Sequence, residues 1–152
     1  MIKFEKSIFI KTSSDEIWKL LVADRLVEWQ PYMKKMKEFK YLTDVNSLSD
    51  KYQVGKTMLF GNTCHYEILE SIKNERLKYR AYESNFLGDQ CGEVIFSIKQ
   101  SKDECELIYA FVFDFPNRRS KIIYDNYFFR KWLENRLRIE LEILKGIIEK
   151  KL

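Results

Sequence analysis

Glu140 is the side chain with the clearest chemical potential, because it falls within the apolar stripe of a predicted C-terminal helix. A carboxylate in such surroundings is costly unless it is paired or hydrogen-bonded. Arg136 lies one turn earlier on the same flank and could pair with it, although Arg before Glu is the less favourable order. Two interpretations stay open: the residues anchor the polar end of a ligand, or they form an intrahelical ion pair at a partly solvated edge. In the first case, Glu140→Gln should change ligand affinity far more than thermal stability.

Tyrosine hydroxyls form a second group of candidates. Tyr66, Tyr79 and Tyr109 fall on the inward side of predicted strands, and Glu83 lies toward one rim of the same face. Buried phenols seek hydrogen-bond partners. These groups could therefore orient or polarise a ligand carbonyl, or they are core residues bonded to backbone or water.

The sequence lacks the residue patterns that metal, nucleotide or serine-hydrolase chemistry would need. His65 is the single histidine and is predicted on the outer face, so too few ligands converge for a metal site. The segment C-H-Y-E contains H-x-E, but no P-C-x-x-C follows as in zinc deaminases. No phosphate-binding glycine loop and no G-x-S-x-G motif occurs. We therefore expect neither a metal nor a cofactor.

Composition predicts a soluble globular protein with one domain spanning residues 1–152. The net charge of +4 is spread along the chain, which argues against nucleic acid as a partner. Three cysteines without C-x-x-C spacing argue against a disulfide framework. With no apolar run long enough for a membrane span and no secretion signal, we expect a cytoplasmic location.

Hydrophobic periodicity predicts the elements that position these residues. A half-buried strand covers Ile2–Lys11, a helix starts at Ser13 or Ser14, and a second short helical turn covers Asp24–Trp29, with Pro31 discouraging continuation. An antiparallel meander follows, and a helix within Lys121–Leu152 ends the chain. The meander strands are predicted near Val54–Gly61, Thr63–Lys73, Arg76–Ser84, Cys91–Lys99 and Cys105–Phe115.

The turns also predict a register, in which Ile68 pairs with Ala81 and Ala81 with Val94. That register gathers one interior face, which the apolar stripe of the last helix, centred on Leu133, Leu137 and Leu144, must cover. A twisted sheet leaves a gap at one end, which Trp18, Trp29 and Pro31 are expected to seal. The interior face comprises Tyr66, Ile68, Ile72, Leu77, Tyr79, Ala81, Val94, Phe96, Ile98, Cys105, Leu107, Tyr109, Phe111 and Phe113.

Several segments together resemble the START-related helix-grip superfamily (SRPBCC), in its polyketide cyclase/dehydrase and lipid-transport branch. They are SIFIKTSSDEIWKLL, EWQP, VGKTMLFG, CHYEILESIKNERLKYRAY and the final amphipathic helix. The resemblance implies an α+β helix-grip fold, in which a seven-stranded curved antiparallel sheet wraps around a long C-terminal helix and two short helices follow strand 1. It also implies an internal cavity for an apolar or amphipathic ligand.

The function expected from this resemblance is binding or carriage of a hydrophobic or amphipathic small molecule, such as a lipid, an isoprenoid or a polyketide-like compound. One alternative is a cyclase or dehydratase that uses cavity Tyr and Glu side chains as acid and base. Another is a protein-binding regulatory domain. A cavity smaller than about 300 Å³ would weaken both of the cavity-based functions and favour this one. The expected cavity residues are Tyr66, Tyr79, Glu83, Phe96, Tyr109, Phe111, Phe113, Phe129, Leu133, Arg136, Leu137 and Glu140.

The head of the last helix carries a mixture of aromatic and cationic residues, IIYDNYFFRKW over 122–132. Such a segment suits transient contact with a membrane surface. It suits equally the lip of the cavity or a contact with a second copy of the chain.

Overall fold

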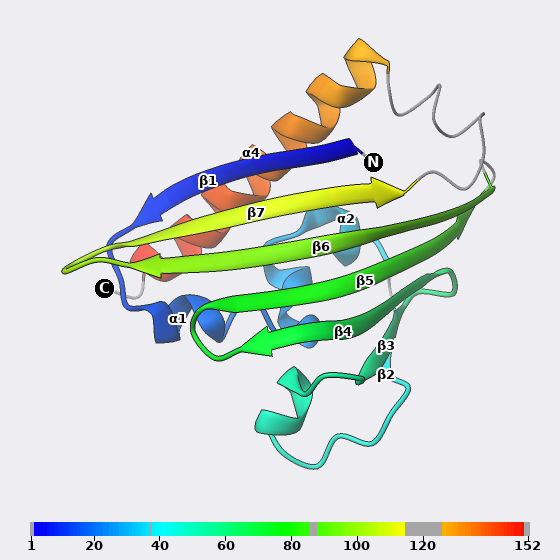
Figure 1. The fold of residues 1–152 in the computed structure, drawn as a ribbon, viewed down its shortest axis with the longest axis horizontal. Helices are drawn as coiled ribbons and strands as arrows, with labels where there is room; N and C mark the ends of the chain where they lie inside the picture. Colours follow the sequence, from blue (N-terminus) through cyan, green and yellow to red (C-terminus); the bar gives the residue numbers. More distant parts are fainter. Residues whose placement is uncertain (1, 37, 86–87, 115–125, 151–152) are drawn as a thin grey trace.

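A computed structural model describes residues 2–36, 38–85, 88–114 and 126–150, and within them one antiparallel sheet forms the framework (Figure 1). Its seven strands run in the order β1-β7-β6-β5-β4-β3-β2. The N-terminal strand pairs with the last one, so the chain begins beside the end of its own meander. The strands are β1 (Ile2–Ile10), β2 (Phe39–Tyr41), β3 (Thr57–Phe60), β4 (Cys64–Ile72), β5 (Arg76–Asn85), β6 (Gly88–Gln100) and β7 (Cys105–Asp114).

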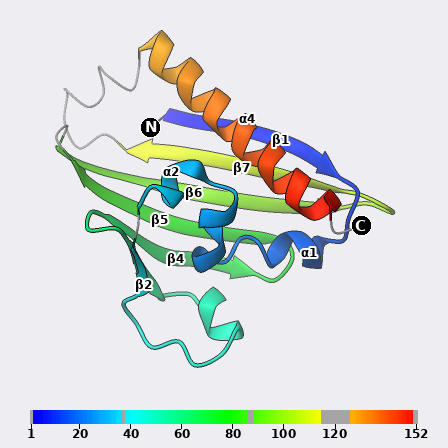
Figure 2. The same cartoon turned by 180° about the vertical axis from the view of Figure 1, so that it is seen from behind.

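The long helix α4 (Tyr127–Lys150) lies across one face of this curved sheet (Figure 2). Its buried side chains recur every three or four residues, which places them on a single stripe against the strands. They are Leu133, Leu137, Leu141, Leu144 and Ile148, with Glu140 as the one charged member. Residues 121–125, which the sequence assigned to this helix, lie outside the described residues. The predicted helix-grip fold is confirmed.

Short helices between β1 and β2 lie on the same face of the sheet as α4 (Figure 2). They are α1 (Ser14–Trp18), the 3₁₀-helix η1 (Ala23–Glu28) and α2 (Pro31–Lys34), where the sequence predicted only two. The 3₁₀-helix η1 ends at Glu28, before Pro31, as expected, but Pro31 also starts α2, a helix that the sequence did not predict. Proline is well tolerated there, since the first turn of a helix leaves its N–H groups unpaired in any case. A further 3₁₀-helix, η2 (Ser49–Tyr52), lies between β2 and β3.

The strand register differs from the predicted one by two residues. Ala81 pairs with Tyr66 and with Gly92, and Tyr79 pairs with Ile68 and with Val94. A shift of two keeps every side chain on its predicted face, because the side-chain period of a strand is two.

Ile72 is the exception among the predicted interior residues. The register of β4 shifts between Ile68 and Glu70, and this irregularity reverses the alternation beyond it. As a result, Ile72 is 44% exposed instead of buried. Among the described residues, no helix is both long and apolar enough to cross a bilayer.

Candidate functional site

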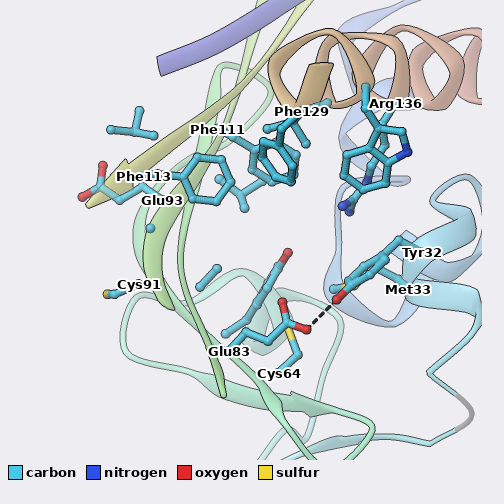
Figure 3. A pocket seen from close by; sticks show the side chains of 17 residues that line it. Tyr32, Met33, Cys64, Glu83, Cys91, Glu93, Phe111, Phe113, Phe129 and Arg136 are labelled. Carbon is cyan, nitrogen blue, oxygen red and sulfur yellow. Dashed lines mark hydrogen bonds between the residues drawn. The ribbon is translucent and has the colours of Figure 1, made fainter. Parts of the chain in front are cut away.

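A cavity of about 230 Å³ lies where β5, β6 and β7 face the first turns of α4 and helix α2 (Figure 3). Its walls are mostly apolar, and its polar groups include Arg136, Tyr32 and Glu83. The volume is below the range of about 300–1,000 Å³ that is usual for drug-sized ligands. By the size criterion drawn from the sequence, it counts against the two cavity-based functions and favours a protein-binding domain. Of the residues expected to line a cavity, the structure places seven there: Tyr66, Glu83, Phe111, Phe113, Phe129, Leu133 and Arg136.

Gly92 shapes one wall of this cavity. It pairs with Ala81 on one side and Phe113 on the other. A Cβ atom at this position would lie 2.7 Å from the backbone oxygen of Val112, closer than such atoms approach in proteins. The close approach of β6 to β7 therefore requires glycine here, and the missing side chain leaves space in front of the strand.

Behind the cavity, Glu140 is 1% exposed and both of its carboxylate oxygens are hydrogen-bonded. Arg136 Nε donates to Oε1 at 2.9 Å, and the Tyr109 hydroxyl donates to Oε2 at 2.8 Å. The buried amide of Gln30 donates in turn to the Tyr109 hydroxyl at 3.0 Å. The Arg136–Glu140 pair is thus intrahelical, but it lies in the interior rather than at a solvated edge. Burial raises the pKa of the Glu140 carboxyl, and the hydrogen bonds from Arg136 and Tyr109 oppose that rise.

Arg136 connects this network to the cavity. Its guanidinium carbon lies 4.3 Å from the centre of the Tyr32 ring and 5.6 Å from that of Phe111, in cation–π geometry. Within the described residues, Nε is the only guanidinium nitrogen with a hydrogen-bond partner. The remaining nitrogens are therefore available to a group in the cavity.

Tyr32 was missed by the sequence analysis, although it follows directly on the EWQP segment. Helix α2 brings it to the cavity, where its hydroxyl donates to Glu83 Oε1 at 2.5 Å (Figure 3). Burial, and then the carboxylate of Glu83, raise the pKa of Tyr32, so this phenol stays protonated and acts as a donor.

The three tyrosines predicted to face inward lie at different depths in the protein. Tyr79 is fully buried and donates to the backbone oxygen of Leu21 at 2.7 Å, while Tyr109 belongs to the Glu140 network. Tyr66 borders the cavity, and its hydroxyl makes no hydrogen bond within the described part of the chain. Burial raises the pKa of all three phenols.

The remaining predicted residues lie away from the cavity. Phe96 and Leu137 belong to the core beneath it. Trp29 is also in that core, where its Nε1 donates to the Leu20 oxygen at 2.8 Å. Trp18 stacks on Tyr52, and Pro31 is exposed. None of the three residues expected to form a seal borders this cavity, and α2 contributes Tyr32 and Met33 to its lining instead.

Metal-binding clusters of three or more His, Cys, Asp or Glu side chains are absent from the described residues. His65 lies exposed on the outer face beside Tyr82. Cys64 borders the cavity, and burial, followed by the charge of Glu83, raises the pKa of its thiol to about 12. This thiol is therefore a poor nucleophile at neutral pH.

Comparison with known proteins supports the fold. No protein-family model and no curated protein matches the chain. Among solved structures, protein MLL2253 from Mesorhizobium loti is 14% identical with a TM-score of 0.68, and the match covers 98% of each chain. DynU16, a protein of the dynemicin biosynthetic locus, is 14% identical with a TM-score of 0.63, over 97% of this chain and 47% of its own. The Aha1 dimer from Colwellia psychrerythraea is 15% identical with a TM-score of 0.57, over 95% and 94%. At these identities the similarity shows the shared helix-grip fold.

Proposed function

We propose that this protein binds a small, mainly apolar molecule in the cavity between the sheet and α4. The observation that carries the proposal is the cavity of about 230 Å³, with aromatic walls and the unpartnered nitrogens of Arg136 at its polar end. Apolar walls with a few convergent polar groups are what small-molecule sites generally share.

The volume restricts the ligand to a small member of the expected classes. An apolar cavity of about 150 Å³ is enough for benzene. A space of about 230 Å³ therefore suits a molecule of one or two rings, or a short branched chain, rather than a lipid with two acyl chains.

Filling the cavity tests the proposal. Ala81 lines it from β5, whereas its neighbour Arg80 is exposed on the opposite face. We expect Ala81→Phe to weaken binding of toluene or 4-hydroxyacetophenone by at least about tenfold, measured by ligand-observed NMR. The control Arg80→Phe adds the same ring outside the cavity and should leave affinity unchanged. Equal affinities in wild type and Ala81→Phe, or no binding to wild type, would contradict the proposal.

Native mass spectrometry of the purified protein offers a second readout. A co-purified small molecule that is lost in Ala81→Phe would identify the natural ligand class. A mass change in that molecule during incubation would favour the cyclase or dehydratase alternative. In that case the candidate base is Glu83, which lines the cavity and accepts a hydrogen bond from the Tyr32 hydroxyl.

A protein-binding domain is the second candidate, because the cavity is small and the head of α4 exposes large aromatic residues. Tyr127, Phe128 and Trp132 are 65%, 79% and 53% exposed. Exposed aromatic residues beside cations suit a partner surface, a second copy of the chain or a transient membrane contact. If a dimer forms there, we expect Phe128→Ser to lower the molar mass measured by light scattering. If a membrane binds there, we expect the same variant to reduce co-sedimentation with vesicles. If Phe128→Ser changes neither the molar mass nor the co-sedimentation, the cavity remains the proposed functional site.

A further inference from the structure

The charges around the cavity are unevenly compensated. The positive charge of Arg136 is already paired with the buried carboxylate of Glu140 at 2.9 Å. Glu83 also borders the cavity, and within the described residues its partner is the neutral hydroxyl of Tyr32 rather than a cation. The polar end therefore carries one carboxylate that forms no ion pair with any described residue.

The other acidic residue of the wall does not change this balance. Glu93 also borders the cavity, and Lys78 Nζ lies 3.9 Å from its carboxylate. Lys78 in turn is shared with Glu70 at 3.7 Å. Glu93 shares the outer face of the sheet with Arg80, and its carboxylate points away from the cavity (Figure 3). Among the described residues lining the cavity, Arg136 is the only cation, so an incoming anion meets one neutralised guanidinium and the carboxylate of Glu83.

From this arrangement we infer that the cavity selects an uncharged ligand bearing both a hydroxyl donor and a carbonyl acceptor, and discriminates against carboxylates. The hydroxyl donates to Glu83, whose carboxylate retains acceptor sites beyond the one that Tyr32 uses. The carbonyl accepts from the free nitrogens of Arg136. Because Tyr32 contacts both residues, through its hydroxyl and its ring face, it fixes the spacing between donor and acceptor sites.

The apolar walls complete the recognition. Phe111, Phe129 and Leu133 line the cavity together with these polar groups. In such surroundings an unpaired polar group is penalised more strongly than in water. A carboxylate ligand would be desolvated here without gaining a free cation, whereas a hydroxy-ketone would satisfy both polar positions.

Two nearly isosteric probes separate these possibilities. This inference rests on the proposed function, so toluene serves first to establish that the cavity binds an apolar molecule at all. We then expect 4-hydroxyacetophenone to bind wild-type protein at least about tenfold more tightly than 4-hydroxybenzoate, measured by ligand-observed NMR at neutral pH. Failure of all three to bind contradicts the proposed function itself. Binding of toluene with equal or tighter binding of 4-hydroxybenzoate overturns the charge selection alone.

Glu83→Gln tests the residue behind the selectivity. Glutamine keeps an oxygen that accepts from Tyr32 but removes the charge, so we expect the preference for the ketone over the benzoate to fall by about tenfold. Glu67→Gln removes one carboxylate from β4 at an ion pair of 3.9 Å with Arg80, away from the cavity, and should keep the wild-type preference. An unchanged preference in Glu83→Gln would overturn the assignment. If that variant does not fold, the wild-type ratio of the two affinities still decides.

Discussion

Breaking the buried ion pair by Arg136→Met should destabilise the protein strongly. Methionine retains most of the apolar stem but leaves Glu140, which is 1% exposed, with the Tyr109 hydroxyl as its one remaining partner. Removing one member of a buried pair costs about 3–5 kcal/mol, because the other charge stays desolvated. For a protein of this size, that lowers the melting temperature by roughly 6–20 °C.

The same helix supplies a matched control. Arg138 and Glu142 have the same i,i+4 spacing and a distance of 3.0 Å, but both side chains are more than half exposed. Exposed pairs contribute about 0–1 kcal/mol, so Arg138→Met should change the melting temperature little. Urea unfolding followed by circular dichroism measures both variants. Equal, small losses for the two would refute the buried character of the Arg136–Glu140 pair.

The pH dependence of this destabilisation gives a second check. Burial raises the folded-state pKa of Glu140 above its ordinary value of 4.5, and losing Arg136 raises it further. A folded-state pKa above the unfolded one means that the native state binds more protons, so stability falls as pH rises through that window. The deficit of Arg136→Met should therefore be smallest near pH 4.5 and grow toward neutral pH. A deficit independent of pH would show that lost packing, not the stranded charge, is the cause.

Three further variants or reagents test individual contacts. Gly92→Ala should lower the free energy of unfolding by about 1–3 kcal/mol, because its Cβ would meet the Val112 oxygen at 2.7 Å; unchanged urea unfolding would contradict that close approach. Trp29→Phe should cost about 1–3 kcal/mol, since the Leu20 oxygen loses its donor; a melting temperature equal to wild type would count against it. Cys64, with a thiol pKa raised to about 12, should resist iodoacetamide in the native state and react once denatured, and rapid native labelling seen by peptide mass spectrometry would be inconsistent with its burial.

Sequence patterns predicted the fold because the buried face of a strand or helix stays the same when the predicted register is wrong by two residues or the predicted helix boundary is shifted. The strand pairing of Ala81 differed by two residues from the expected one, yet its side chain stayed on the inner face. The helix stripe through Leu133 and Leu137 likewise fixes which side meets the sheet, regardless of where the helix begins. The position of Ile72 could not be predicted in this way, because a single register irregularity in β4 exchanges the inner and outer faces for the residues that follow it.

The cavity was harder to predict than the face on which it lies. Alternation along a strand assigns Tyr66, Tyr79 and Tyr109 to the same side of the sheet, but it does not give their depth below α4 and α2. In the structure, Tyr66 borders the cavity, whereas Tyr79 and Tyr109 are covered and bonded within the protein. Tyr32 reaches the cavity on helix α2, which begins at Pro31 and which the sequence did not predict.

The hydrogen bonds of Glu140 connect the stability of the fold to the cavity. Neither of the two interpretations of Glu140 drawn from the sequence included this connection. Glu140 is 1% exposed and is not among the residues that line the cavity, so it does not contact a ligand there directly. A pair of well-packed apolar residues would commonly be as stable as a buried ion pair or more so, so stability alone gives no physical reason for a carboxylate here. Its effect is instead to hold Arg136 by Nε, which leaves the guanidinium stacked on Tyr32 and its other nitrogens without a partner among the described residues. If the cavity binds a ligand as proposed, Glu140 is therefore a positioning residue: it would fix the donor that faces the cavity and cancel the positive charge that would otherwise attract an anion.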